Sequence, residues 1–263
     1  MTRRTLDGLL KYPWAAGDGT YPKKWGYYES EAEIFEWVRR GRPSRERSVI
    51  AEIMDWGDDI TFAIHDLLDF YCAGKVPIDR CKRRQSPERE RLIRGMFKRK
   101  PSWKKEERDY LAALSDILDQ FPFEPEDRYD DSRAHRARLY AFSTSLIRYF
   151  IGAFRLDSSS VVRIDVDAHR AVEVLKQFIW EYIIENPELA VPQNGQQAAV
   201  RCVFTQLLNA SKDGKYYLFP SGFQRQIANA RTKRERARVV ADCISGMTEK
   251  EILHIHRSLQ GLH

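Results

Sequence analysis

The sequence predicts an all-α protein, and three observations carry that prediction. Apolar residues recur with helical spacing through most of the 263 residues, helix-capping residues stand where the periodic segments begin, and one short stretch alternates in the manner of a strand. That stretch is 161–166, in which β-branched residues dominate. We therefore expect a multi-helix bundle with at most one short strand or hairpin.

Capping signals predict where helices begin in the first half of the chain. Ser30 and Glu33 have the spacing of a capping box, and the helix that they open is expected to stop at Gly41. Ser86 followed by Pro87 predicts the start of another helix, because proline is favoured at the first helical position.

The second half of the chain is expected to be helical as well. Apolar periodicity predicts helices over 104–120, 133–154, 168–185, 196–208 and 233–244. Thr248 and Glu251 have the form of another capping box, and the helix that they open runs to about Leu259. Two proline-containing stretches are expected to be exposed loops: 120–131, which also carries five acids, and 187–195.

The helix expected at about 46–74 carries a polar face. A rotation of about 100° per residue puts four side chains within roughly a quarter turn of Asp58: Phe62, His65, Asp66 and Asp69. Acids between apolar walls cost stability unless a cation pairs with them, so this face predicts a metal, a basic cluster or a polar ligand. A partly solvated helix face is the alternative.

Two motifs resemble a known family. The run DDITFAIHDL at 58–67, preceded by TLDGLLKYPW at 5–14, resembles the deoxynucleoside triphosphate triphosphohydrolases, which are dGTPase-like proteins of the HD superfamily. The resemblance implies that Asp58 is a metal ligand, that Phe62 packs against the deoxyribose, and that Asp66 accepts a hydrogen bond from the sugar hydroxyl. Most members carry tyrosine where this chain has Phe62, so the packing surface is kept and a phenolic hydrogen bond is lost.

The family's metal site has further ligands that this sequence does not match. In the family, two histidines and an aspartate of an N-terminal HD motif precede the Lys-Tyr-Pro-Trp segment, and none of the ten residues before Lys11 is a histidine. The adjacent His65 and Asp66 lie in the later helix, where the family does not use such a pair for the metal. The resemblance therefore implies a C-terminal portion, an HD-superfamily-like bundle lacking its N-terminal HD-motif helices. It implies an incomplete ligand set for Mn²⁺ or Mg²⁺ and no complete catalytic set in this chain.

The resemblance also implies two domains. Residues 1–121 correspond to the C-terminal part of the HD-type catalytic domain, and residues 132–263 correspond to a helical phosphohydrolase-associated domain. Because the family commonly forms closed multimers, a homo-oligomer is expected, and a separate chain that carries the HD motif is a candidate partner.

The charge of the chain favours anionic partners, with a net charge of +6 and a pI of about 9.1. Arg133 and Arg136 are candidates for contacts with the phosphates or the sugar of a nucleotide. Lys11 is a candidate phosphate contact, with a structural anchor as the alternative. Basic clusters, one of which contains Trp103, leave single-stranded nucleic-acid binding open, although interleaved acids weaken that interpretation.

Three functions remain open at this stage. The first is hydrolysis of a deoxynucleoside triphosphate such as dGTP to a deoxynucleoside and triphosphate, which requires that a His…His-Asp segment be supplied. The second is a non-catalytic helical module for nucleotide binding or assembly, and the third is single-stranded nucleic-acid binding. No apolar run long enough for a membrane span and no signal peptide are evident, so we expect a cytoplasmic protein with reduced cysteines.

Overall fold

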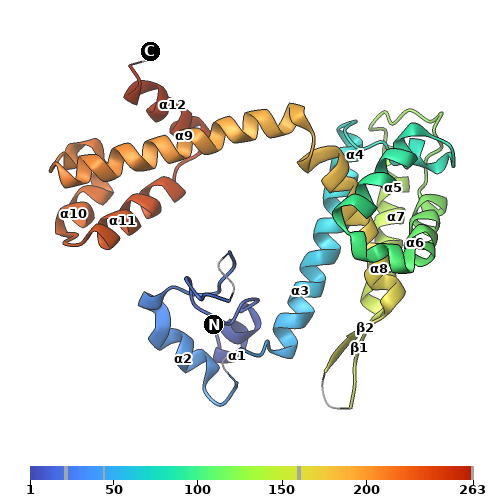
Figure 1. The fold of residues 1–263 in the computed structure, drawn as a ribbon, viewed down its shortest axis with the longest axis horizontal. Coiled ribbons are helices and arrows are strands. Elements are labelled where there is room, and N and C mark those ends of the chain that lie inside the picture. The colour runs from blue at the N-terminus through green and yellow to red at the C-terminus, as the bar shows by residue number, and fades with distance from the viewer. Residues whose placement is uncertain (21–22, 44, 159–160, 262–263) are drawn as a thin grey trace. The chain divides into compact units, whose positions relative to one another are not determined.

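The computed structural model describes residues 1–20, 23–43, 45–158 and 161–261, and packing divides the chain into two compact units, Met1–Glu185 and Asn186–His263 (Figure 1). Helices dominate both units, and the sheet among the described residues is a two-stranded hairpin. The prediction of an all-α fold with one short hairpin is confirmed. Of the helices described, none is both long and apolar enough to cross a membrane.

The first unit contains most of the chain. Its α-helices are α1 (Arg3–Gly8), α2 (Ala32–Arg39), α3 (Val49–Thr61), α4 (Leu67–Cys72), α5 (Pro87–Arg99), α6 (Glu107–Gln120), α7 (Arg133–Gly152) and α8 (Val166–Ile179). Short 3₁₀ turns are η1 (Glu29–Glu31), η3 (Arg80–Lys82) and η4 (Pro101–Glu106), and two π-helical segments, η2 (Phe62–Asp66) and η5 (Trp180–Ile184), continue α3 and α8. The strands β1 (Phe154–Leu156) and β2 (Val162–Ile164) connect α7 to α8.

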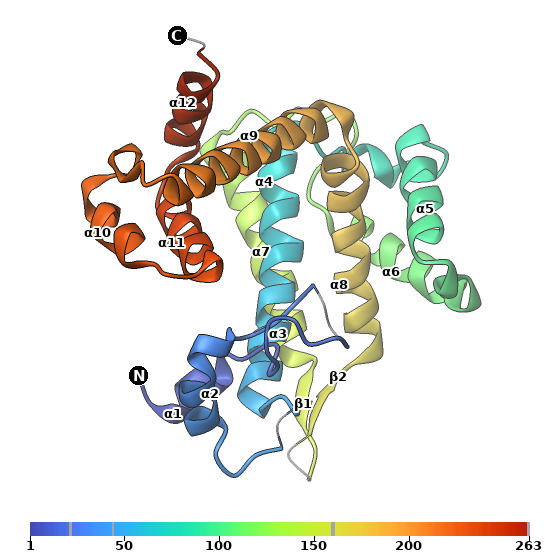
Figure 2. The ribbon, with the colours of Figure 1, turned by 60° about the vertical axis from the view of Figure 1, so that its left-hand side comes forward.

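The continuous helix formed by α3, η2 and α4 lies at the centre of this unit. Segment η2 packs against both α7 and α8, and α8 also packs against α5 and α6 (Figure 2). The Trp56 indole donates to the Phe150 carbonyl at 3.1 Å, whereas the rings of Tyr71 and Tyr129 lie 5.8 Å apart. Since Phe150 is at the end of α7 and Tyr129 is just before its start, the central helix and α7 run antiparallel.

The middle of the central helix departs from α-helical geometry. Ser48 caps its start by accepting from the Ala51 amide, and Gly74, with φ of 69°, follows its end, so the helix expected at 46–74 is present. The π turn η2 holds one residue more than an α turn, so the residues after it are rotated back by about 100°. Asp66 therefore lies within roughly 30° of Asp58 about the helix axis, whereas a regular α-helix would separate them by about 80°.

The hairpin is antiparallel, with Phe154 paired to Ile164 at its base. It confirms the strand expected within 161–166. Val166 already belongs to α8, because the Asp165 carboxylate caps that helix by accepting backbone amides of its first turn.

One predicted capping box is wrong. The helix expected to open at Ser30 and Glu33 is instead preceded by the 3₁₀ turn η1, where the Glu31 carboxylate accepts from the Tyr28 amide at 2.9 Å. Tyr28 is not one of the residue types that usually cap helices, so the sequence pattern points to Ser30 instead. The expected stop is correct, because α2 ends just before Gly41, whose φ is 81°.

The loop expected over 187–195 is also wrong, because these residues begin a long helix. The second unit contains α9 (Pro187–Lys212), the 3₁₀ turn η6 (Tyr216–Leu218), α10 (Ser221–Asn229), α11 (Lys233–Ser245) and α12 (Glu249–Leu259). Asn186 caps α9, Pro187 stands at its first position, where no amide is needed, and Pro192 removes one internal hydrogen bond. The other turns of this 26-residue helix offset that loss.

The second unit has its own core, in which α9 packs against α11 and α12. The capping box of Thr248 and Glu251 is present as expected, and α12 ends at Leu259. Packing divides the chain after Glu185. The boundary expected between 121 and 132 concerns family domains and not packing units, and it stays a prediction.

Candidate functional site

Asp58 is paired with a lysine from the first segment of the chain. The Lys11 ammonium donates to Asp58 Oδ2 at 3.2 Å and forms a second ion pair with Asp55, one helical turn earlier. The Asp58 side chain nevertheless remains 65% exposed. The structure thus brings together two of the residues singled out from sequence, and it pairs them with each other.

A tight turn holds Lys11 in place. The Trp14 amide donates to the Tyr12 carbonyl at 2.8 Å, and the Trp14 indole donates to the Lys24 carbonyl at 2.6 Å. The Gly26 backbone lies so close to this turn that a β-carbon there would collide with the Tyr12 carbonyl oxygen. The Lys-Tyr-Pro-Trp segment therefore carries Lys11 against α3 from an anchored backbone.

These contacts decide the protonation of the groups around Asp58. Burial alone would lower the pKa of Lys11, but hydrogen bonds to Asp55 and Asp58 outweigh it and raise that pKa above its usual value. Burial would likewise raise the pKa of Asp55, but hydrogen bonds from Lys11 and Arg47 lower it instead. At neutral pH Lys11 is a cation and Asp55 is an anion.

The neighbouring carboxylate, Asp59, has a different partner. Lys176 of α8 forms ion pairs with Asp59 and with Glu173, both at 2.9 Å. Burial would lower the pKa of Lys176, and the bonds to these two carboxylates raise it instead. Adjacent residues point about 100° apart on a helix, so Asp58 and Asp59 reach different elements. Sequence analysis missed Asp55, Asp59 and Lys176 as parts of this cluster.

Phe62 and Asp66 continue the line of Asp58 along the central helix. The Phe62 side chain is 38% exposed, so its ring has a solvent-facing surface. Asp66 is half-buried, and its pKa is raised mainly by burial and then by the charge of Asp69, with His65 opposing. The π turn puts the three side chains on one side of the helix, and at about 1.5 Å per residue the outer two are about 12 Å apart along the axis.

Arg133 and Arg136 lie in the first turns of α7. Because α7 is antiparallel to the central helix, these arginines stand toward its Asp66 end and not its Asp58 end. Both are exposed, and Arg136 lies 3.7 Å from the carboxylate of Asp131.

The side chains present do not by themselves fit a metal ion. Among the residues that the structure describes, no three His, Cys, Asp or Glu side chains are close enough together to hold one. In addition, the ammonium of Lys11 already neutralises Asp58. Asp58 stands as a single candidate ligand, and a cation would need further ligands from other residues.

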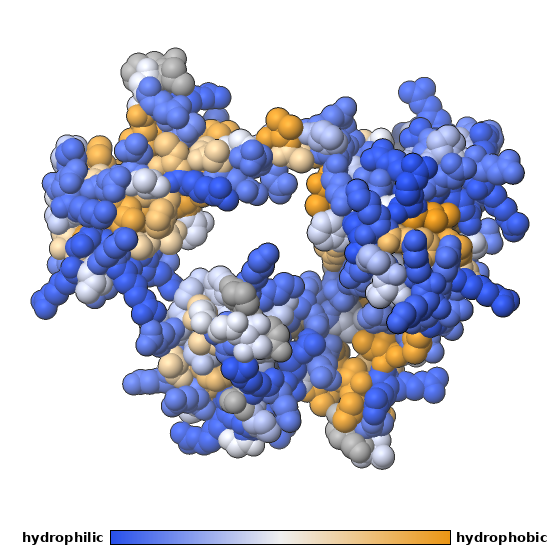
Figure 3. Space-filling model, viewed as in Figure 1, coloured by the Kyte–Doolittle hydropathy of each residue, from blue (hydrophilic) through white to orange (hydrophobic). Residues whose placement is uncertain are grey.

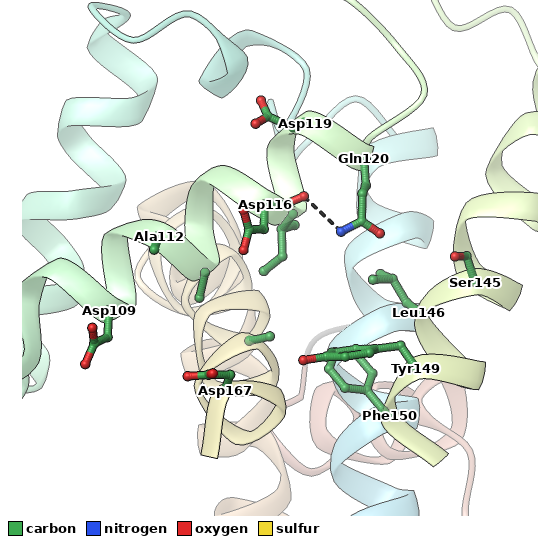
Figure 4. A pocket seen from close by; sticks show the side chains of 13 residues that line it. Asp109, Ala112, Asp116, Asp119, Gln120, Ser145, Leu146, Tyr149, Phe150 and Asp167 are labelled. Carbon is green, nitrogen blue, oxygen red and sulfur yellow. Dashed lines mark hydrogen bonds between the residues drawn. The ribbon is translucent and has the colours of Figure 1, made fainter. Parts of the chain in front are cut away.

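A cavity of about 770 Å³ lies away from these candidates, between α6, α7 and α8 (Figure 4). Its lining includes four aspartates and several apolar side chains, and Tyr149 is among the lining residues. None of the six candidate site residues lines it.

The aromatic residue suggested for nucleic-acid stacking is not available on the surface. Trp103 is 9% exposed and is stacked on Tyr110, with ring centroids 4.1 Å apart. The basic cluster around it therefore lacks a free aromatic platform at this position.

Comparison with known proteins first gives a family match in the C-terminal part of the chain. Residues 162–258 match the phosphohydrolase-associated domain. This match begins at β2, so α8 belongs to the matched segment although it packs within the first unit.

The whole chain is similar to dGTPase-like proteins. It is 27% identical to a deoxyguanosinetriphosphate triphosphohydrolase-like protein of Corynebacterium efficiens over 293 residues, covering 100% of this chain. Proteins of the same description from Streptomyces coelicolor and Shewanella sediminis are 28% and 26% identical, covering 99% and 98% of the chain. The chain spans 63% of the length of each of these relatives. The resemblance predicted from 5–14 and 58–67 is confirmed.

Proposed function

We propose that this chain forms the sugar-binding side of a deoxynucleoside triphosphate triphosphohydrolase that acts in the cytoplasm. The observation that carries the proposal is the alignment of Asp58, Phe62 and Asp66 on one side of the central helix, which depends on the π turn η2. The similarity to dGTPase-like proteins along the whole chain supports it. The proposed reaction converts a deoxynucleoside triphosphate to a deoxynucleoside and triphosphate.

Each of the three aligned residues has a distinct proposed role. The exposed ring of Phe62 offers an apolar surface for the deoxyribose, and without a phenolic hydroxyl it contributes packing only. The carboxylate of Asp66 accepts a hydrogen bond from the sugar hydroxyl. Asp58 is one ligand of a divalent cation, Mn²⁺ or Mg²⁺, whose other ligands come from a His…His-Asp segment that these 263 residues do not include.

Lys11 has two proposed states in this scheme. In the structure described here it neutralises Asp58, and its bond to Asp55 would hold it nearby if a cation displaced it from Asp58. From that position the ammonium could contact a phosphate of the bound nucleotide. The exposed Arg133 and Arg136, at the other end of the central helix, are proposed to contact the substrate beyond Asp66.

A non-catalytic nucleotide-binding role is the second candidate, and the Lys11–Asp58 ion pair favours it. A carboxylate that is already paired with an ammonium has less attraction for a cation, whereas Asp66 forms no ion pair with any residue that the structure describes and the Phe62 ring is partly exposed. In that case the chain would recognise the deoxyribose without turnover.

Two measurements separate these functions. Purified chain is incubated with dGTP and Mn²⁺ or Mg²⁺, alone and with a polypeptide that carries the His…His-Asp segment, and released triphosphate is quantified. The proposal expects release only in the combined sample and its loss in the variant Asp58→Asn, with Glu52→Gln on the same helix as the matched control. No release in any sample, from proteins shown to be folded, would refute the enzymatic proposal.

The second measurement is the shift of the melting temperature by dGTP in the absence of a metal. A non-catalytic binder shows a shift that Asp66→Ala abolishes and Asp58→Asn preserves, by ligand linkage. If neither variant changes the shift, the nucleotide binds elsewhere and the central helix is not its site.

A further inference from the structure

We propose that the surface around Tyr149 joins two copies of this chain. Tyr149 is 49% exposed on α7 and lines two hollows of opposite charge. The first is the cavity between α6, α7 and α8, and its carboxylates are those of Asp109, Asp116, Asp119 and Asp167 (Figure 4). The second is a hollow of about 640 Å³ at the base of the hairpin, where three arginines, Arg148, Arg155 and Arg163, outnumber one carboxylate, Asp165.

Charges on both sides of Tyr149 lack partners within the part of the chain that the structure describes. Asp116 and Asp119 are exposed and form no ion pair there, while the other two acids of the cavity are neutralised by Arg170. On the other side, Arg148 and Arg155 are exposed and, among the same described residues, are likewise unpaired. One tyrosine is therefore flanked by two unpaired acids and by two unpaired arginines.

The same surface exposes apolar side chains and strand edges. Four large apolar residues on and beside the hairpin are more than two-fifths exposed: Ile151 at 62%, Leu156 at 51%, Val161 at 44% and Val166 at 60%. Figure 3 shows apolar residues gathered at the base of the hairpin. As far as the structure describes them, β1 and β2 pair only with each other. An isolated two-stranded sheet is marginally stable in water, and its free edges readily pair or pack with a partner.

A second copy of the chain is the partner that matches both hollows at once. In a two-fold symmetric contact, a residue on the axis meets its own counterpart, and features on opposite sides of the axis meet each other. With Tyr149 near the axis, the acidic cavity of each copy faces the arginines of the other. The apolar residues would form the centre of the contact and the charges its rim, as in known interfaces. The inference does not depend on the proposed enzymatic function.

Charge exchange tests this arrangement. One double variant, Arg148→Glu with Arg155→Glu, makes both hollows acidic, and another, Asp116→Arg with Asp119→Arg, makes both hollows basic. Sedimentation velocity over a concentration series should show that the unmodified chain self-associates. Each double variant alone should self-associate more than about 100-fold more weakly, because like charges then meet across the contact.

Mixing the two double variants should restore association, because each acidic hollow then faces a basic one. All four substitutions are at exposed positions, so far-UV circular dichroism and the melting temperature should stay unchanged. The control carries Arg94→Glu and Glu90→Arg on α5, outside both hollows, and should associate like the unmodified chain.

Four results would overturn the proposal. In the first, the unmodified chain stays monomeric throughout the concentration series. In the second, both double variants still form the oligomer, and in the third, the mixture of the two variants does not reassociate. In the fourth, the arginines bind an anion and not a second copy of the chain. Anion binding is recognised if inorganic triphosphate raises the melting temperature of a monomeric chain and the double variant Arg148→Glu with Arg155→Glu removes that rise.

Discussion

Lys11→Met removes one ammonium from the cluster around Asp58 and leaves a side chain of similar length in its place. The lost contact with Asp58 is worth about 0–1 kcal/mol, because that carboxylate is largely exposed. A hydrogen bond to a charged, partly buried group such as Asp55 is worth about 1.5–3 kcal/mol, but Arg47 continues to neutralise this carboxylate. We therefore expect the free energy of unfolding to fall by about 1–2 kcal/mol.

Urea unfolding followed by circular dichroism measures this change, and the melting temperature should fall by about 2–4 °C for each kcal/mol. Lys23→Met is the control, because Lys23 is exposed and lies near the same turn. A double-mutant cycle with Asp58→Asn isolates the Lys11–Asp58 pair, with an expected coupling of about 0.5 kcal/mol. If Lys11→Met is no less stable than Lys23→Met and the coupling is zero, the ion pairs described here do not hold the first segment on α3.

Three further substitutions test other parts of the fold. Lys176→Met should lower the free energy of unfolding by about 1–3 kcal/mol, because it removes the ion-pair partner of Asp59 and leaves Glu173 with the more distant Lys100, 3.9 Å away; an unchanged urea midpoint would contradict this. Gly95→Ala should cost about 1–3 kcal/mol, because a β-carbon would collide with the buried carboxylate of Glu181, whereas Gly222→Ala, which meets nothing within 4 Å, should be nearly neutral in the same assay. The pKa of Glu251 is lowered below its usual 4.5, first by the backbone amide at the helix cap, so its stabilising effect is complete above pH 4.5 and is lost as pH falls through the folded-state pKa. Glu251→Gln should therefore reduce the loss of stability on acidification below about pH 4.5, and identical pH profiles of the melting temperature would count against the capping box.

The length of the central helix could be predicted from the sequence, but its π turn could not. Its length follows from apolar periodicity and from Gly74, because burial of one side dictates the spacing of apolar residues. The π turn η2 leaves no such signal, since the dihedral angles that it needs differ little from those of an α-helix and its position depends on how α7 and α8 pack around it. Spacing predicts Asp66 within a quarter turn of Asp58, and the closer alignment of the two side chains could not be predicted from it.

The other differences between the sequence predictions and the structure come from ion pairs between distant residues and from prolines within a helix. Lys11 and Asp58 are 47 residues apart, and a single sequence taken by itself contains no signal that links them. Lys176 and Asp59 are further apart still. The helix at 187–195 was missed because two prolines indicate a loop, although Pro187 occupies the one helical position where its missing amide has no cost.

Because of the wide turn in the central helix, the effect of losing a residue depends on where in the helix it is lost. Removing a single residue from 62–66 would restore regular winding and leave the residues after it, such as the fully buried Leu67, facing as they do now, whereas removing one from the regular turns of α3 would rotate them by about 100°. Exposed side chains such as His65, by contrast, can change without altering that winding. Across homologous proteins, single-residue deletions in the central helix should therefore be confined to this stretch, and substitutions at its outward positions should be frequent.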